Sequence, residues 1–349
     1  MSDPRPFWHP DKHADRRSFL LARGHIKAAI RHWFVQQDFV EVEPGCLQTS
    51  PGNEAHLHAF PTEYLSDSGE TRPLYLHTSP EFAMKKLLAA GERRIFAFSP
   101  VFRNRERGPL HAPEFTMLEW YRAEQGYDDV MQDCRSIVAA AADAAGSDRW
   151  RWRERLADVR LWRETTVCGA FRDICGIDLL ATIGPNGVDL ERMRTAVGGA
   201  GVRVASDDTW SDLFSRVVAE RIEPRLGIGC CEFLTRYPTH EAALARPWGP
   251  DPRLAERFEL YICGVEIANG FGELTDSREQ RRRFEAEMAE KERVYGERYP
   301  IDEDFLAALD RMPDAAGCAM GFDRLVMLAT GAGHIDRVIW TPFTFGPGE

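Results

Sequence analysis

The stretch at residues 102–121 contains side chains suited to a ligand that carries phosphate, a flat ring and an ammonium group. It reads FRNRERGPLHAPEFTMLEWY, and its breakers at 108–109 and 112–113 separate two alternating segments, which predicts two strands joined by a long loop. An arginine fork binds phosphate, an aromatic face stacks on a flat ring, and carboxylates with a phenol suit an ammonium group. The alternative is an amphipathic hairpin with solvated charges. The groups concerned are Arg103 after the first strand and, on the second, Glu114, Phe115, Glu119 and Tyr121.

Two acidic residues farther along the chain suit a divalent metal. Glu266 and Glu273 lie in GVEIANGFGEL at residues 264–274, on either side of an Asn-Gly pair that indicates a bulge in a hairpin. Mg²⁺ takes few protein oxygens and fills its other positions with water and phosphate, so two converging carboxylates would suit it. Solvent-exposed acids are the alternative.

A run of small residues precedes a helix at residues 313–328. The sequence PDAAGCAMGFDRLVML allows close approach of another group to the backbone, and a helix that starts near Phe322 would direct its N-terminus at that place. Arg324, in the first turn, supplies a cation that the helix itself does not require. The pattern predicts a phosphate site, although Gly-rich turns before helices also occur without one.

Ser79-Pro80-Glu81 has the composition of a helix start. Ser79 as the N-cap, Pro80 at the first helical position and Glu81 in the first turn predict a helix over residues 82–90. Helix capping and ligand binding are alternative roles for Glu81, and the residues alone leave both open.

Composition restricts the class of protein. The 349 residues allow one large domain or two ordinary ones, and the formal net charge of -11 argues against broad, sequence-independent binding of nucleic acid. The eight cysteines include no CxxC pair, so neither a zinc site nor a disulfide framework is indicated. The N-terminal residues contain no apolar signal region, and no run approaches the ~20 apolar residues of a membrane span. A cytoplasmic location without a membrane segment is expected.

Hydrophobic periodicity predicts the elements that must position these residues. Residues 1–18 are polar and are predicted to form an N-terminal arm, followed by a helix over 19–37. Alternation at 56–60 predicts a strand that carries His56 and His58 on one face, where solvation is favoured over metal binding.

The segment at about 147–225 contains helix-like stretches and glycine-rich turns, and strand-like patterns resume at residue 231. It is interpreted as a helical insertion in a single domain over residues 19–349. Another helix is expected over 128–146.

Together these segments resemble the three signature motifs of the class II aminoacyl-tRNA synthetases. The helix and strand that end near Pro44 resemble the first motif, residues 102–121 the second, and residues 317–328 the third. The sequences SPEFAMKKLL, EIANGFGELTD and GFDRLVML are similar to the lysine-specific branch. The resemblance extends from about residue 19 to residue 342, and it implies an α+β fold in which an antiparallel β-sheet is flanked by helices.

The resemblance to lysyl-tRNA synthetases does not include their anticodon-binding domain. Lysyl-tRNA synthetases carry an N-terminal anticodon-binding barrel before the first motif, which here begins near residue 20. The chain is therefore similar to the family of stand-alone relatives that attach (R)-β-lysine to a lysine side chain of translation elongation factor P, and tRNA is not an expected partner. Ala319 and Ala268 stand where the synthetases usually have Gly, and a methyl group changes substrate discrimination by ~1–3 kcal/mol. That family implies a homodimer.

The resemblance implies an ATP-dependent, AMP-forming ligase that uses Mg²⁺. Adenine would lie against Phe115 and beneath Arg324, Arg103 would contact the α-phosphate and the substrate carboxylate, and Glu266 with Glu273 would hold the metal. Arg103 and Arg324 are the implied catalytic residues, because orientation and charge stabilisation dominate such chemistry. The implied ATP-binding residues are Arg103, Asn104, Arg105, Glu106, His111, Ala112, Phe115, Glu266, Ile267, Gly321 and Arg324.

The resemblance also implies how the amino acid binds. Glu81 would receive the amino group near the carboxylate. The distal ammonium would be received by Glu119, Tyr121 and Glu273. The implied substrate-binding residues are Ser79, Pro80, Glu81, Glu119, Tyr121, Asn269, Phe271, Glu273 and Ala319.

Several residues depart from the family pattern. Arg105 replaces the acidic residue of FRNE, with Glu106 as its neighbour, and Ala112 replaces an amide in the loop between the two strands. Gly272 replaces a polar residue, and the proline of the first motif, Pro44, lies one position early. The first two changes concern contacts of the loop with ATP.

Three alternatives stay open at this point. A lysyl-tRNA synthetase paralogue would make lysyl-adenylate, and a synthetase-like binding or regulatory module would bind ligand without turnover. An amide ligase similar to asparagine synthetase would need a pocket for an acidic substrate, which the acids at 81, 119 and 273 oppose.

Overall fold

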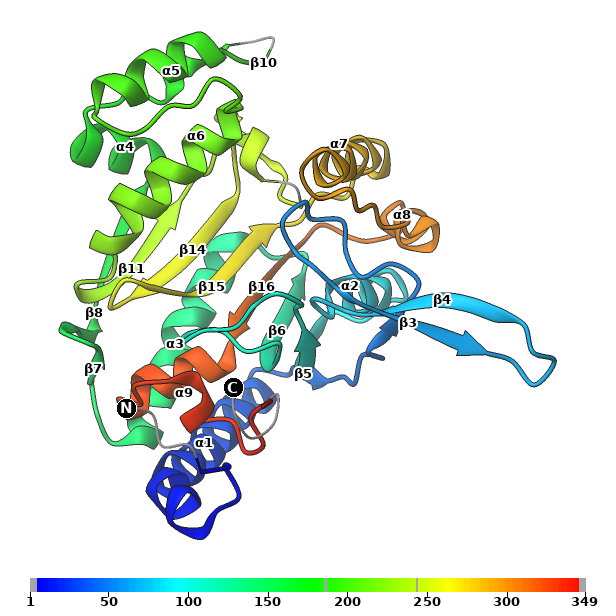
Figure 1. Ribbon diagram of the computed structural model, residues 1–349, viewed down its shortest axis with the longest axis vertical. Coiled ribbons are helices and arrows are strands. Elements are labelled where there is room, and N and C mark those ends of the chain that lie inside the picture. Colours follow the sequence, from blue (N-terminus) through cyan, green and yellow to red (C-terminus); the bar gives the residue numbers. More distant parts are fainter. Residues whose placement is uncertain (1–4, 185–186, 243, 345–349) are drawn as a thin grey trace. The chain divides into compact units, whose positions relative to one another are not determined.

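A computed structural model describes residues 5–184, 187–242 and 244–344 (Figure 1). The chain divides into two compact units, one formed by Met1–Ser147 with Thr275–Glu349 and the other by Asp148–Leu274. The predicted organisation as a single domain over 19–349 stays a prediction. Within the described ranges, no helix is long and apolar enough to cross a membrane.

The first unit is built on strands of a mainly antiparallel sheet in the order β1-β5-β6-β16. β1 is parallel to β5, whereas the β5–β6 and β6–β16 pairs are antiparallel. A separate three-stranded sheet has the order β2-β4-β3. The strands are β1 (Val40–Glu41), β2 (Leu47–Gln48), β3 (Phe60–Leu65), β4 (Thr71–Leu76), β5 (Arg94–Phe102), β6 (Glu114–Ala123) and β16 (Ala315–Gly321).

The helices of this unit follow the expected periodicity closely. The predicted segments at 82–90 and 128–146 correspond to α2 and α3, each displaced by one residue. The helices are α1 (Pro10–Gln36), α2 (Glu81–Ala89), α3 (Tyr127–Ala145), α7 (Ser277–Tyr295), α8 (Glu303–Leu309), α9 (Phe322–Thr330) and the 3-10 turn η5 (Ile335–Arg337).

The start of α1 corrects the predicted arm. The helix begins at Pro10 rather than residue 19, because His9 accepts a hydrogen bond from Asp11 N at 3.4 Å and Pro10 is favourable at the first position. Farther along, the apolar face of α1 is buried, and Phe34 stacks on Phe96 of β5 with ring centroids 4.4 Å apart. Polar residues before position 19 concealed a helix whose first turns are mostly exposed.

One other local prediction was wrong. Residues 56–59 form no strand, because Asn104 N bonds to His58 O at 2.7 Å in an isolated bridge and β3 begins only at Phe60. The small residues at 315–321 form the strand β16, in which Ala319 pairs with Glu119 across the β6–β16 ladder.

The second unit contains strands in the order β15-β14-β11-β8-β7. β8 is parallel to β11, and the other pairs are antiparallel. Two smaller pairs are β9 with β10 and β12 with β13. The strands are β7 (Arg149–Trp152), β8 (Arg155–Thr166), β9 (Ile183–Gly184), β10 (Gly187–Val188), β11 (Gly229–Thr235), β12 (Pro247–Trp248), β13 (Asp251–Ala255), β14 (Arg257–Ile262) and β15 (Val265–Gly272).

Residues 147–225, predicted to be a helical insertion, begin with the strands β7 and β8. Helices start only at Val167 and bury their apolar faces in one cluster that includes Phe171, Trp210 and Phe214. The helical elements of this unit are α4 (Val167–Cys175), η1 (Leu180–Thr182), α5 (Leu190–Gly199), α6 (Trp210–Val217), the π-helical turn η2 (Val218–Ile222), η3 (Glu223–Arg225) and η4 (Thr239–Glu241).

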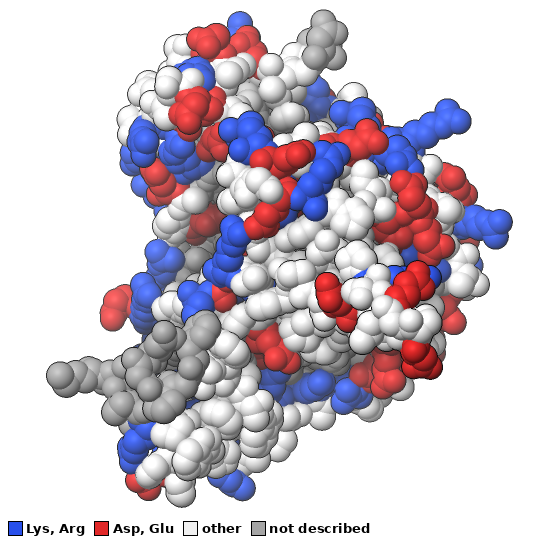
Figure 2. Space-filling model, turned by 45° about the vertical axis from the view of Figure 1, so that its right-hand side comes forward, with Lys and Arg blue, Asp and Glu red and all other residues white. Residues whose placement is uncertain are grey.

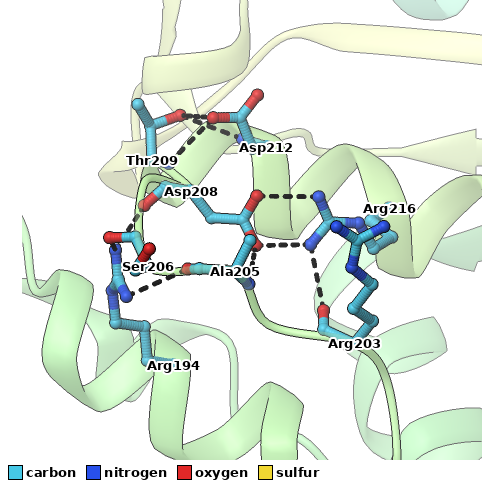
Figure 3. A network of polar contacts seen from close by, with 8 residues as sticks. All are labelled: Arg194, Arg203, Ala205, Ser206, Asp208, Thr209, Asp212 and Arg216. Carbon is cyan, nitrogen blue, oxygen red and sulfur yellow. Dashed lines mark hydrogen bonds and ion pairs between the residues drawn. The ribbon is translucent and has the colours of Figure 1, made fainter.

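A polar network fixes the connection between α5 and α6 (Figure 3). Asp208 accepts two hydrogen bonds from Arg216, at 2.5 and 2.7 Å, and one from Ala205 N at 2.6 Å. Arg194 donates to the carbonyl oxygens of Ser206 and Asp208. The connection is therefore held by charge-assisted bonds rather than by regular secondary structure.

Candidate active site

Glu81 and Glu119, the two carboxylates of the first unit that were predicted to receive the substrate amines, lie at the start of α2 and on β6. Glu119 on β6 is 1% exposed, and it accepts hydrogen bonds from Ser79 Oγ at 2.8 Å and Tyr121 Oη at 2.6 Å. Glu81 begins α2 and forms an ion pair with the buried Lys85. The structure thus brings four predicted substrate residues, including Ser79, into one polar cluster.

The start of α2 differs slightly from the prediction. Pro80 occupies the N-cap position, and the helix begins at Glu81. Ser79 Oγ still accepts a hydrogen bond from Glu81 N at 3.1 Å, while its hydroxyl donates to Glu119. Ser79 therefore links the helix start to the buried carboxylate.

Glu119 has an unusual protonation equilibrium. Burial, followed by the charge of Glu81, raises the pKa of Glu119 to about 8, although bonds from Tyr121 and Ser79 and the charge of Lys85 oppose the rise. At neutral pH the carboxyl is therefore largely neutral, because a buried anion without a full counter-charge is unfavourable. An arriving ammonium group would supply the missing positive charge.

Arg103 follows β5 directly and is held beside an aromatic ring. Its Nε donates to Thr78 O at 3.2 Å, and its guanidinium carbon lies 5.5 Å from the centroid of the Phe115 ring. The β5–β6 register sets this proximity, because Phe102 pairs with Glu114 at the end of the ladder. A cationic fork beside a half-buried aromatic face suits a phosphate attached to a flat base.

Arg324 lies in the first turn of α9 and contacts the loop between β5 and β6. Its Nη2 lies 2.7 Å from His111 Nε2, and its Nε donates to Leu110 O at 3.2 Å. Burial and then the charge of Arg324 lower the pKa of His111, so the imidazole is neutral near pH 7 and accepts that hydrogen bond. Two other residues that were assigned to ATP lie nearby in the sequence. Gly321 is the last residue of β16, three positions before Arg324, and Ala112, which follows His111, is buried.

Arg105 is directed to another part of the first unit. It has a left-handed backbone (φ 66°), forms an ion pair with Glu297, and lies over the Tyr295 ring at 5.8 Å. Asn104 Oδ1 accepts a hydrogen bond from Arg105 N at 2.9 Å, and Glu106 is half-buried. Arg105, which replaces an acidic residue of the family pattern, is therefore held by its ion pair with Glu297.

In the second unit, a β-bulge determines which residues of β15 share a face. Residues 266 and 273 are separated by an odd number of positions, which would place them on opposite faces of a regular strand. Leu260 of β14 pairs with Ala268, but the next residue, Tyr261, pairs with Glu266. Ile267 is therefore the extra residue of the bulge on β15. The shift puts Glu266 on the face shared by Asn269, Phe271 and Glu273, as bulges beside functional sites commonly do.

The predicted position of the bulge was wrong, although its presence was expected. Asn269 and Gly270 pair regularly with Glu259 and Phe258. Asn269 Oδ1 is buried and has no hydrogen-bond partner among the described residues, which suits an amide that receives a donor from a ligand. Glu273, just beyond β15, is 1% exposed.

Sequence reasoning missed a third acidic residue in this region. Glu259 on β14 accepts hydrogen bonds from Tyr237 at 2.5 Å, Tyr261 at 2.6 Å and Arg257 at 2.6 Å. Burial, and then Glu259, raise the pKa of Tyr237 well above its ordinary value, so the phenol stays a donor. The alternation in RFELYI was the available signal, because it places residues 257, 259 and 261 on one face.

The acidic residues on and beside β14 and β15 are candidate ligands for a metal ion. No group of three or more His, Cys, Asp or Glu side chains capable of holding a metal ion occurs among the described residues. Glu266 and Glu273 nevertheless share one strand face with Glu259, and carboxylate oxygens are the ligands that Mg²⁺ prefers. The set fits an ion that takes one or two protein oxygens and completes its shell with phosphate and water.

Comparison with known proteins places the chain in a family. The sequence model described as tRNA synthetases class II (D, K and N) matches residues 12–344. An Elongation factor P--(R)-beta-lysine ligase of Vibrio cholerae is 34% identical over 328 residues, covering 93% of this chain and 95% of the relative. Proteins of the same name are 36% identical over 335 residues in Haemophilus influenzae (95% and 96% covered) and 37% over 322 residues in Histophilus somni (92% and 93%). The chain therefore belongs to the class II tRNA synthetase family (D, K and N), alongside the elongation factor P–(R)-β-lysine ligases.

Proposed function

We propose that this protein activates (R)-β-lysine with ATP and transfers it to a lysine side chain of elongation factor P. The relatives at 34–37% identity carry the name of that ligase. The observation that carries the proposal is the buried cluster of Glu119, Glu81, Ser79 and Tyr121, whose carboxylates suit a substrate with two ammonium groups.

The first step would join the substrate carboxylate to the α-phosphorus of ATP, with pyrophosphate as the leaving group. Arg103 would neutralise charge on the α-phosphate and the carboxylate, and Phe115 and Arg324 would hold the adenine ring. Such groups accelerate the reaction by orienting the reactants and by stabilising developing charge. The proximity of Arg103 to Phe115, at 5.5 Å, supports this assignment.

Mg²⁺ would neutralise phosphate charge when bound, and Glu266 with Glu273 would hold it. Phe271 and Asn269, on the same face of β15, would shape the amino-acid pocket, and Glu273 would also face the distal ammonium. Ala319, opposite Glu119 in the β6–β16 ladder, would adjust the room for the substrate beside that carboxylate.

In the second step, the amine of the acceptor lysine would attack the carbonyl carbon of the adenylate. The new amide bond replaces the bond to AMP, which leaves with the electron pair, and the amine loses a proton. That proton would pass to the solvent. Assembly as a homodimer in the cytoplasm is part of the proposal and rests on the family resemblance.

Pyrophosphate exchange tests the first step. We expect exchange that depends on (R)-β-lysine and is faster than exchange with α-lysine, together with no charging of tRNA. Preference for α-lysine with efficient tRNA charging would instead identify a lysyl-tRNA synthetase paralogue. Binding of lysine without any exchange would identify a module that has lost catalysis.

A further inference from the structure

The backbone at Glu273 is held from both sides. A segment over residues 244–246 runs antiparallel to residues 272–274, with Arg246 N donating to Gly272 O at 2.8 Å and Leu274 N donating to Leu244 O at 3.0 Å. On the other side, Gly272 N donates to Glu256 O at 2.8 Å. Glu256 N also donates to Arg246 O at 3.0 Å, which closes the arrangement.

The side chains of the two flanking residues meet directly over Gly272. Arg246 Nε lies 2.7 Å from Glu256 Oε2. A Cβ atom on residue 272 would lie 2.2 Å from that carboxylate oxygen, closer than real Cβ atoms approach, and at a tight 3.0 Å from Arg246 Nε. The ion pair therefore occupies the space that a side chain at 272 would need. We call Arg246, Glu256 and Gly272 the clamp.

Stability alone does not explain the clamp. The side chains of Arg246 and Glu256 are 26% and 18% exposed, and an ion pair with such access to solvent contributes little to the free energy of unfolding. The clamp can instead matter for the position of substrate-binding residues. A displacement of such a group by about 1 Å can reduce the reaction rate roughly 100-fold. The clamp lies directly between Phe271 and Glu273, two residues assigned to the substrate.

We infer that the Arg246–Glu256 ion pair, lying over Gly272, positions Glu273 and Phe271 for recognition of the distal ammonium group of the substrate. Arg246 and Glu256 are positioning residues, since they act through the backbone of residues 271–273. The inference rests on the proposed function for its substrate, but the clamp itself is a feature of the second unit alone.

The test compares Gly272→Ala and Arg246→Ala with the wild-type protein in the exchange assay. Each variant is expected to raise KM for (R)-β-lysine roughly 10- to 100-fold while KM for ATP changes less than about twofold. The double variant R246E/E256R, which restores an ion pair of reversed direction, is expected to recover most of the affinity lost in Arg246→Ala. A general loss of structure would raise both KM values and would not be rescued.

Matched controls exist in the same unit. Gly249→Ala adds a methyl group where no atom lies within 4 Å, and Arg253→Ala removes an ion pair with Asp251 at 2.7 Å. Both should behave like wild type. Unchanged amino-acid KM in Gly272→Ala, or an equal rise in the controls, would overturn the inference.

Hydrogen exchange separates this inference from the proposed function. The amides of Arg246 and Leu274 should exchange roughly 10-fold faster in Gly272→Ala than in wild type, because their bonds frame the clamp. If wild-type protein supports no amino-acid-dependent exchange, the proposed function fails, and these amides still report on the clamp. Unaltered protection would contradict it in either case.

Discussion

Glu119 is a carboxyl group whose ionisation should be coupled to binding. Its pKa of about 8 means that it is mostly protonated at pH 6 and mostly ionised at pH 9. A bound ammonium group favours the ionised form, so binding of the diamine at pH 6 or 7 must release a proton.

We therefore expect the affinity for (R)-β-lysine to rise by up to about tenfold per pH unit between pH 6 and 8, and to level off above. Calorimetry in buffers of different ionisation enthalpy should measure proton release near one per site at pH 6. Glu119→Gln should bind weakly with little pH dependence. A steep dependence that survives in Glu119→Gln would assign the proton to another group.

Arg324 offers a second prediction at this scale. Arg324→Ala removes the cation next to His111 and should reduce pyrophosphate exchange at least 100-fold, the size expected for one charge-stabilising donor. Arg93→Ala is the matched control, because Arg93 is 64% exposed in its pair with Glu124. Exchange rates in Arg324→Ala close to those of the control would refute a catalytic role.

The contacts of a residue could be predicted where the local sequence determines its position. Ser79, Glu119 and Tyr121 meet because Glu119 and Tyr121 share one face of β6 and Ser79 precedes α2. Arg105 was assigned to ATP only by resemblance, and its partner Glu297 is almost 200 positions away, where no local pattern could indicate it.

The presence of a helix or strand was easier to predict from the sequence than its ends or its irregularities. The β5–β6 hairpin follows from alternation and from breakers in its loop, and α9 follows from its apolar run. The bulge at Ile267 could not be located, because its position depends on the pairing with β14 rather than on the Asn-Gly pair. Yet that bulge decides whether Glu266 and Glu273 share a face.

The connection between α5 and α6 provides a prediction at the scale of elements. Hydrogen bonds from Arg216 lower the pKa of Asp208 to about 2, although burial opposes the shift. A lowered carboxyl pKa stabilises the fold above the unfolded pKa near 4, and this contribution is lost as the pH falls toward 2.

Asp208→Asn should reduce the free energy of unfolding by roughly 1–3 kcal/mol at pH 7, because charge-assisted bonds are lost. The difference from wild type should shrink between pH 4 and pH 2, as measured by urea unfolding. Asp207→Asn, which changes an exposed neighbour, should have little effect at any pH. A deficit that persists at pH 2 would exclude ionic stabilisation as its cause.

At the scale of the whole molecule, charge agrees with a protein acceptor better than with a nucleic acid. The net charge is -11, and Figure 2 shows basic and acidic side chains interspersed over the displayed face. Broad electrostatic binding of a polyanion needs a field of one sign. The fold class was predictable from the three motifs, and the family match over residues 12–344 confirms it. The division into two compact units was not foreseen.

The central claim is that an acid-lined site energises a diamine carboxylic acid and passes it to a protein. The most direct test is intact-mass analysis of purified elongation factor P after incubation with this protein, ATP, Mg²⁺ and either (R)-β-lysine or α-lysine. We expect addition of one lysyl residue to one acceptor lysine, faster with the β-isomer and dependent on Glu119. An unchanged mass with both isomers, under conditions in which a known ligase of this family modifies the same factor, would contradict it.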